Sequence, residues 1–520
     1  MNDLMGQFPS AEQSQIASLS QVVDARRIRA NRRLDPKNKI AQGQFMTPRP
    51  VAQFMSSLFQ SWDRDEVRLL DAGAGIGSLT AAFVEEFCNG KHSVRHIAAT
   101  GYEIDPLLVE ELRATFDDCA QICRNQEIAF EPKIIQRDFI EEFANPLFMQ
   151  VEMSRLFTHA ILNPPYKKIH SASSHRLFLR SLGIEASNLY TGFLAIAINL
   201  LEPGGELVAI TPRSFCNGPY FKPFRRLLLD QMTIRHIHIF ESRTHAFKED
   251  EVLQENIILY AVMGRQQESV TISLSEDADV THSRSRVVAF SEIVKPDDRD
   301  LFIHITANVN EQQLVERMNA LPCKLEDLSI DVSTGPVVDF RLKNYLRATP
   351  EMSTVPLIYP AHCKDNFVVW PVPNCRKPNA IVDAEPVQKW LYPNGYYILV
   401  RRFSSKEDRR RIVATIHDPN DVPGQKIGFE NHLNIFHQGR HGLTPEVAKG
   451  LAVYLNSTFC DTCFRQFNGH TQVNVKDLYN LRYPDLATLE MLGKRVNNQV
   501  FPTQDEIDEL IYTWMDKSGF

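Results

Sequence analysis

The feature that most constrains the fold is the stretch VRLLDAGAGIGSL at residues 67–79. An apolar run ends at Asp71, and Gly73, Gly75 and Gly77 then lead into a segment with the spacing of an amphipathic helix. Glycines allow a backbone to approach a ligand closely, and a helix N-terminus favours negative charge. A tight strand-to-helix turn without a ligand is the alternative. The G-x-G-x-G spacing differs from the dinucleotide fingerprint, and the missing lysine excludes a P-loop.

The first half of the chain continues with the same alternation of strands and helices. Strands are expected at residues 96–105, 132–140, 156–165 and 207–212, with helices at 106–120 and 191–201. This period predicts an α/β fold with a doubly wound, Rossmann-like sheet, which binds ligands at the carboxyl ends of its strands. Polar residues stand at those ends, among them Glu103, Asp138 and Asn163.

The chain of 520 residues is too long for one ordinary core. After about residue 265 the pattern becomes polar and turn-rich, which predicts an edge hairpin and a linker, and from about 325 it is β-rich and punctuated by proline. We expect a helical extension at 1–40, an α/β domain at 41–290, a β-rich domain at 325–485 and a helical segment at 486–520.

Composition narrows the class of protein. The nine cysteines are irregularly spaced and indicate reduced thiols in the cytoplasm. Cys460 and Cys463 form a lone CxxC pair, so no metal site is expected. The polar N-terminal stretch predicts no secretory leader, and no apolar run is long enough to span a membrane. The net charge of −7 argues against nonspecific binding to a polyanion. Basic patches at 26–33, 222–226 and 401–411 are nevertheless compatible with nucleic-acid binding, and an ordinary solvated surface is the alternative for each.

The acidic strand ends suggest the cofactor. Glu103 can accept the ribose hydroxyls of an adenosine, and Asp138 can accept its amino group, with Phe139 alongside. Acids in three different environments suit a nucleoside without a pyrophosphate. S-adenosylmethionine therefore fits better than NAD.

Together these motifs resemble the gamma class of S-adenosylmethionine-dependent DNA adenine-N6 methyltransferases, over about residues 40–265. QFMTPRPVAQFM resembles the upstream cofactor motif, LLDAGAGIG the glycine motif, GYEID the ribose motif, RDF the adenine motif and NPPY the catalytic motif. The resemblance implies a bacterial type II restriction–modification methyltransferase. It implies the cofactor-binding residues Thr47, Pro48, Asp71, Gly73, Gly75, Gly77, Glu103, Asp138, Phe139 and Asn163. NPPY alone also occurs in enzymes that methylate rRNA and protein glutamine.

The NPPY motif explains how a poorly nucleophilic amino group could react. The side-chain oxygen of Asn163 and the carbonyl of Pro164 can each accept one amino hydrogen, and Pro164 and Pro165 hold these acceptors rigid. Tyr166 offers a face for stacking the base. No general base is required before attack. A Pro-Pro turn that merely ends a strand is the alternative.

A duplex adenine must be flipped out of the stack to reach such a site. The family uses a second aromatic residue to hold it, for which Phe247 is the best match here and Phe240 the competitor. A phenylalanine of the core is the alternative for Phe247.

The second half is expected to be a DNA target-recognition domain. FNGHTQVNVKDLYNLRYP, residues 467–484, resembles a segment of such domains and carries His470, Gln472 and Asn474 at alternating positions. These side chains suit base edges. The expected phosphate contacts are Arg401, Arg402, Arg409, Arg410 and Arg411. A polar turn that caps a helix at Asp477 is the alternative for the segment.

The expected partners are double-stranded DNA and a cognate restriction endonuclease on a separate chain, because no acidic-pair-plus-lysine nuclease motif is evident. An RNA or protein-glutamine methyltransferase is the rival enzyme, although such enzymes usually have a shorter accessory region. A noncatalytic DNA-binding specificity protein is the rival of another class, and the intact NPPY and cofactor acids argue against it.

Overall fold

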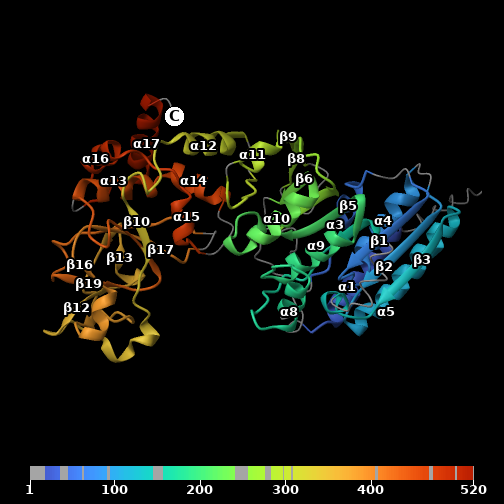
Figure 1. The fold of residues 1–520 in the computed structure, drawn as a ribbon, viewed down its shortest axis with the longest axis horizontal. Helices are drawn as coiled ribbons and strands as arrows, with labels where there is room; N and C mark the ends of the chain where they lie inside the picture. Colours follow the sequence, from blue (N-terminus) through green and yellow to red (C-terminus); the bar gives the residue numbers. More distant parts are fainter. Residues whose placement is uncertain are drawn as a thin grey trace, which may run out of the picture. The chain divides into compact units, whose positions relative to one another are not determined.

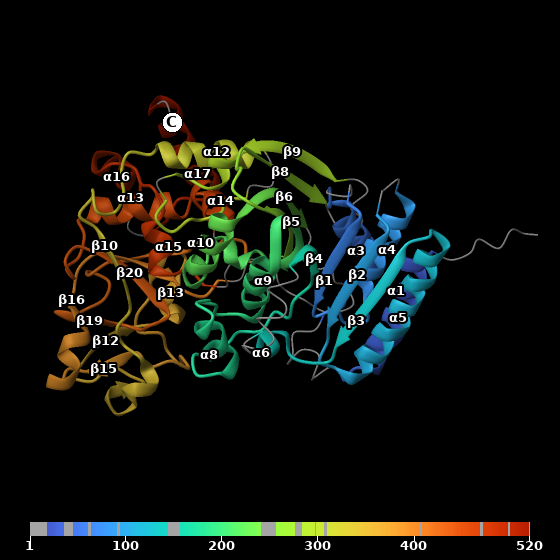
Figure 2. The same cartoon turned by 45° about the vertical axis from the view of Figure 1, so that its right-hand side comes forward.

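The computed structural model describes residues 18–35, 45–60, 64–90, 94–143, 156–240, 256–275, 283–296, 298–305, 309–404, 408–467, 472–497 and 500–518. The chain divides into two compact units, Met1–Ile303 and His304–Phe520. Each unit is described separately below, and Figures 1 and 2 show the elements of both.

The first unit is built on a nine-stranded sheet in the order β3-β2-β1-β4-β5-β7-β6-β8-β9. The strands are β1 (Glu66–Ala72), β2 (His96–Tyr102), β3 (Ala129–Ile135), β4 (Phe157–Leu162), β5 (Leu201–Pro212), β6 (Met232–Phe240), β7 (Asn256–Met263), β8 (Ser269–Ser275) and β9 (Arg284–Ala289). The neighbours from β3 to β5 are parallel, and β7 inserts antiparallel between β5 and β6. The predicted doubly wound sheet is confirmed. The edge hairpin is confirmed as well, since β8 and β9 pair antiparallel.

Helices cover this sheet in two groups (Figure 2). The first group comprises α1 (Leu19–Arg33), α3 (Arg49–Ser57), α4 (Ser78–Asn89) and α5 (Pro106–Asn125), and the second comprises α6 (Phe139–Phe143), α8 (Ser174–Ser181), α9 (Leu189–Leu200) and α10 (Lys222–Gln231). α9 carries almost nothing but apolar side chains and is buried all round. A helix of this kind sits within a core rather than at a surface.

One arginine from each of two basic patches is engaged inside the first unit. Arg26 pairs with Asp118 at 2.8 Å and ties α1 to α5. Arg225 is fully buried, and its Nη1 donates to the carbonyl oxygens of Phe215 and Gly218, both at 2.8 Å. A buried guanidinium must satisfy its donors internally. These arginines therefore hold elements together instead of forming a solvated basic face.

The second unit contains two smaller sheets, in the orders β10-β20-β17-β18-β14-β13 and β11-β15-β12-β19-β16. Their strands are β10 (Asp331–Thr334), β11 (Leu346–Arg347), β12 (Thr354–Ile358), β13 (Cys363–Lys364), β14 (Phe367–Val368), β15 (Ala380–Val382), β16 (Leu391–Pro393), β17 (Tyr397–Arg401), β18 (Ala414–His417), β19 (Lys426–Phe429) and β20 (Leu433–His437). The β-rich second half is thereby confirmed.

Helices complete the second unit. They are α12 (Val309–Ala320), α13 (Pro445–Leu455), α14 (Thr458–Phe467), α15 (Val475–Tyr479), α16 (Leu486–Gly493) and α17 (Gln504–Ser518). α17 buries Ile507, Ile511, Trp514 and Met515, a helical spacing that lays one apolar face on the core. Cys460 and Cys463 are buried in that same core. No group of three or more potential ligands is arranged to hold a metal ion within the described ranges.

None of the helices in the described part of the chain is both long enough and apolar enough to cross a membrane.

Candidate active site

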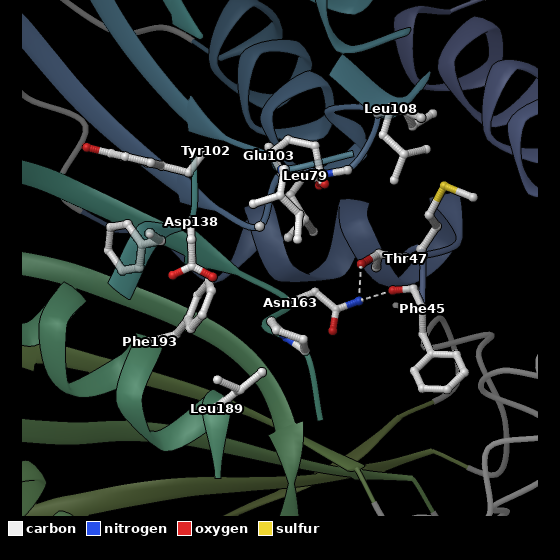
Figure 3. A pocket seen from close by; sticks show the side chains of 18 of the residues that line it. Phe45, Thr47, Leu79, Tyr102, Glu103, Leu108, Asp138, Asn163, Leu189 and Phe193 are labelled. Atoms are coloured by element: carbon white, nitrogen blue, oxygen red, sulfur yellow. Dashed lines mark hydrogen bonds between the residues drawn. The ribbon is translucent and has the colours of Figure 1, made fainter. Parts of the chain in front are cut away.

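A cavity of about 310 Å³ lies at the carboxyl ends of β1, β2 and β4 (Figure 3). Its wall combines the glycine loop, two carboxylates, the start of the NPPY motif, a histidine from α8, and apolar side chains from α6, α9 and the segment before α3. It is lined by Phe45, Met46, Thr47, Gly73, Ala74, Gly75, Ile76, Ser78, Leu79, Tyr102, Glu103, Ile104, Leu108, Arg137, Asp138, Phe139, Asn163, Pro165, Lys167, His175, Leu189 and Phe193. The motifs that the sequence places far apart thus meet around one hollow.

The glycine loop forms part of this wall, but its three glycines have different structural roles. Gly73 and Gly75 line the cavity with φ of 78° and 56°, a left-handed backbone that favours glycine. Gly77 does not line it. A Cβ at Gly77 would lie 2.8 Å from Leu112 Cδ1, so this glycine allows α4 to pack closely on α5. For Gly77 the tight-turn interpretation describes the structure, and its contact with the cofactor stays a prediction.

Glu103 follows β2 and is held by backbone donors. Its Oε2 accepts from the Gly75 N–H at 2.9 Å, and its Oε1 accepts from the N–H groups of Ile104 and Asp105 at 2.8 and 2.9 Å. Burial of this carboxylate raises its pKa, although the three backbone donors oppose the rise. A carboxylate offers about four lone-pair sites, so Oε2 retains capacity for a ligand hydroxyl.

Asp138 begins the turn into α6 and carries a partner that the motifs did not indicate. Its Oδ1 accepts from the Ile140 and Glu141 N–H groups at 2.9 and 3.0 Å. Its Oδ2 lies 3.0 Å from Nε2 of His175 on α8. Burial opposes ionisation of Asp138, but the imidazole and the backbone donors outweigh it and lower its pKa. The same hydrogen bond, acting against partial burial, raises the pKa of His175.

His175 is a polar lining residue that the sequence analysis did not single out. It lies 37 positions beyond Asp138, on a short helix inside the loop that follows NPPY. The only local signal is Ser173, a helix N-cap whose Oγ accepts from the Arg176 N–H. Such a signal predicts the helix but not what it faces.

Asp71 lies beneath the glycine loop and is not part of the cavity wall. It is completely buried, and its Oδ2 accepts from Thr80 Oγ1 at 2.7 Å. Its Oδ1 is buried and has no hydrogen-bond partner in the described ranges. Burial raises the pKa of Asp71 to about 7. Asp71 was expected to bind the cofactor, but its side chain lies buried under the glycine loop and outside the cavity wall.

Asn163 has a fixed orientation (Figure 3). Its Nδ2 donates to the Phe45 carbonyl at 2.6 Å and to Thr47 Oγ1 at 3.0 Å. A flipped amide would press Oδ1 against the Phe45 carbonyl without a proton between them, so Oδ1 must be the acceptor left over. Pro48, the N-cap residue of α3, does not line the cavity.

Tyr166 lies next to this amide. Its hydroxyl is 3.1 Å from Asn163 Oδ1 and 3.3 Å from the Ile210 carbonyl, and burial raises the pKa of the phenol. The ring is half-buried. Pro164 is buried and Pro165 lines the cavity, so the two prolines stand as a rigid corner at the end of β4.

The structure bears on one of the two candidates for the second aromatic residue. Phe247 lies outside the described residues. Phe240, its competitor, ends β6 buried in the core, with its ring 4.7 Å from that of His238. This burial removes Phe240 as a candidate for stacking on a base.

The arginines expected to bind phosphates are mostly engaged in the second unit. Arg401 Nη2 donates to the Cys363 carbonyl at 2.9 Å, Arg402 Nη1 to the Asn431 carbonyl at 2.7 Å, and Arg410 Nη1 to the Asn456 carbonyl. Arg411 is buried, with Nε donating to Ser404 Oγ at 3.1 Å. The phosphate contact expected of Arg411 is wrong, because its guanidinium is inside the core. Arg409 is exposed.

The three residues expected to read bases differ in where the structure places them. His470 lies outside the described residues. Gln472 forms an antiparallel bridge with Phe403. Asn474 is the N-cap of α15, and its backbone N–H donates to Asp477 Oδ2 at 2.8 Å in a capping box. The helix-cap interpretation therefore describes Asn474 in the structure, and its base contact stays a prediction.

Comparisons with known proteins agree on one family. A family model described as Eco57I restriction-modification methylase matches residues 79–247. The chain is 47% identical to the type II methyltransferase M.BsuBI of Bacillus subtilis over 488 residues, which cover 92% of this chain and 95% of the relative. It is 46% identical to the type II methyltransferase M.PstI of Providencia stuartii over 496 residues, with 95% and 97% covered.

Among solved structures, the type IIL restriction-modification enzyme MmeI in complex with DNA matches with a TM-score of 0.51 at 12% identity. The match covers 87% of this chain and 70% of that one. At this identity the likeness concerns the fold alone.

Proposed function

Because this chain belongs to the type II methyltransferases of restriction–modification systems, we propose that it transfers a methyl group from S-adenosylmethionine to N6 of an adenine in duplex DNA. The observation that carries the proposal is the orientation of Asn163. Its Nδ2 is committed to Phe45 and Thr47, so Oδ1 is an acceptor. Oδ1 accepts from the Tyr166 hydroxyl at 3.1 Å and keeps its second lone pair for a ligand, beside a cavity that Glu103 and Asp138 also line.

The residues around the cavity fit the cofactor. A volume of about 310 Å³ is in the range of small-molecule sites, and its wall is largely apolar with two carboxylates. Glu103 Oε2 would accept a ribose hydroxyl, and Asp138 Oδ2 would accept the adenine amino group beside Phe139. The left-handed Gly73 and Gly75 leave the wall without side chains. When bound, the cofactor supplies an electrophilic methyl group on a sulfonium.

The chain's own contribution to transfer is to polarise and aim the target amino group. Asn163 Oδ1 and the Pro164 carbonyl would each accept one amino hydrogen, which directs the nitrogen lone pair away from the ring. Rigid acceptors favour the charge that develops in the transition state over the neutral amine. Tyr166 and Phe247 would hold the flipped base, since a base inside a duplex cannot reach the cavity.

We further propose that the second unit is the target-recognition domain, with Arg409 on phosphates. In the cytoplasm, methylation would protect host DNA from a cognate endonuclease on a separate chain. An RNA or protein-glutamine methyltransferase, or a noncatalytic specificity protein, remains the alternative that the following experiment addresses.

The test is to incubate the purified protein with labelled S-adenosylmethionine and duplex DNA, digest the DNA to nucleosides and locate the label. We expect N6-methyldeoxyadenosine. Label in N4-methyldeoxycytidine would overturn the choice of base, and transfer to RNA or protein but not DNA would overturn the substrate class. Cofactor binding without transfer to any of them would indicate the noncatalytic alternative.

A further inference from the structure

Three segments of the second unit meet where β17 ends. The Arg402 N–H donates to the His432 carbonyl at 2.9 Å, and the Val473 N–H donates to the Arg402 carbonyl at 2.7 Å. Next to this second bond, Phe403 forms an antiparallel β-bridge with Gln472. The chain around residue 402 is therefore the middle of three adjacent strand-like segments, which bring Phe403, His432 and Gln472 together.

Phe403 and His432 form an exposed ring pair. Phe403 is 52% exposed, and among the described residues of this unit Phe340 is more exposed still, at 65%. Its ring centroid lies 5.2 Å from that of His432, and the His432 side chain is 42% exposed. Both rings thus present surface to solvent.

A buried carboxylate orients His432. The side chain of Glu430 is completely buried, and its Oε1 lies 2.5 Å from His432 Nδ1 while its Oε2 accepts from the His432 N–H at 3.0 Å. Burying a carboxylate is costly unless it is paired. Its pairing fixes the imidazole through Nδ1 and leaves Nε2, on the opposite ring edge, without a partner in the described part of the chain.

The neighbouring arginine supports the same turn. Arg402 Nη1 donates to the Asn431 carbonyl at 2.7 Å, between Glu430 and His432 in the chain. Phosphate contacts come from cations and other polar donors and carry no sequence information, whereas base contacts depend on hydrogen-bonding groups aimed at a base edge. Here the Arg402 guanidinium donates to a backbone carbonyl, and the His432 imidazole is held in place by the buried Glu430.

From this arrangement we propose that His432 contacts a base edge of the target DNA through Nε2, that Phe403 packs against the same or the adjacent base, and that Glu430 positions His432. The proposal rests on the proposed function and names residues that determine its specificity. Gln472, at the edge of the same surface, would contribute a second polar contact.

The test uses the full-length enzyme and the site found by sequencing methylated positions in expressing cells. Duplexes with one base pair changed at a time are methylated by the wild type and by His432→Ala, Phe403→Ala and Glu430→Gln. We expect His432→Ala to lower the kcat/KM discrimination at one base pair by about tenfold, with the salt dependence of binding unchanged. His441→Ala, at another exposed histidine of this unit, should leave every ratio unchanged.

The variant Glu430→Gln tests whether Glu430 positions His432 or only stabilises the fold of the second unit. It should lose discrimination at the same base pair as His432→Ala, and the double variant should be no worse than His432→Ala alone. Cofactor affinity, a property of the first unit, and the unfolding midpoint serve as folding controls.

A uniform loss of affinity for all sequences with a smaller salt slope would overturn the inference, because it would indicate a phosphate contact. Unchanged discrimination in folded His432→Ala would overturn it as well. If the wild type methylates no DNA, the proposed function itself fails, and the two failures are distinguishable.

Discussion

Asn163 is the residue on which the proposed transfer depends most directly. Asn163→Ala removes an acceptor used mainly in the transition state, so single-turnover methylation should fall by about a hundredfold or more. Cofactor affinity, measured by calorimetry, should change little. The variant also releases Phe45 and Thr47, so Thr47→Val serves as a control that removes one Nδ2 partner while keeping Oδ1. Near-normal turnover in Asn163→Ala would contradict the catalytic assignment.

The His175–Asp138 pair should make the stability of the first unit depend on pH. The pKa of His175 is raised, so its contribution is present below its ordinary value of about 6.5 and is lost as pH rises through the raised value. The pKa of Asp138 is lowered, so its contribution is present above about 3.9 and is lost as pH falls through the lowered value.

His175→Gln should therefore lower the unfolding midpoint most at about pH 5–6 and least at about pH 9. Both side chains are about a quarter exposed, so we expect a loss below about 1 kcal/mol. His170→Gln, at an exposed histidine of the same loop, is the matched control for thermal scans across this range. A deficit that does not vary with pH would remove the ion-pair explanation.

Among the residues of the site, those at the ends of strands could be predicted from the sequence. Glu103, Asp138 and Asn163 could be placed at one edge because the strand period identifies where each strand ends. The burial of Arg411 and the His175 contact could not be foreseen. A run of arginines looks alike whether its members face solvent or a core, and only the tertiary fold decides which of them does.

At the element scale, the link between α4 and α5 depends on Gly77. Gly77 and Gly183 both have a left-handed backbone, with φ of 86° and 74°, but of the two only Gly77 has neighbours within 4 Å of the position that a Cβ would occupy. Alanine should strain the backbone at both positions and overpack Leu112 only at Gly77. We expect Gly77→Ala to cost about 1–3 kcal/mol more than Gly183→Ala in the free energy of unfolding.

Thermal or denaturant unfolding of the two variants measures this difference. Equal losses would show that the space beside Gly77 is not limiting. Weaker cofactor binding by Gly77→Ala without extra loss of stability would instead restore the expected role of this glycine in the cavity wall.

The elements themselves were predictable to different degrees. The inner parallel strands β1, β2 and β4 are largely apolar, and polar turn residues separate β8 from β9, so both could be predicted from pattern. The insertion of β7 between β5 and β6 could not, because strand order depends on tertiary pairing. Several strands of the second unit have only two residues, such as β11 and β13, which is too short for a periodic signal.

At the scale of the whole molecule, the division into two units permits a test of their separate tasks. The units divide at Ile303 and His304, between the expected end of the catalytic domain and the expected start of the recognition domain. A cut near residue 320 would leave α12 on the first fragment. Met318, on that helix, is buried in the core of the second unit, so a cut at 303 is preferable.

We expect a fragment of residues 1–303 to bind S-adenosylmethionine with nearly the affinity of the full chain, because every residue that lines the cavity lies within it. Its methylation of duplex DNA should fall sharply, since a flipped base requires a duplex that is held around the target, and the second unit would supply that hold. Calorimetry measures the first quantity and transfer of labelled methyl groups the second, with circular dichroism to verify that the fragment is folded. The full chain with Arg409→Gln should keep its sequence preference but bind all DNA more weakly, with a salt slope smaller by about one. A folded fragment that methylates its site as well as the full chain would show that recognition lies in the first unit.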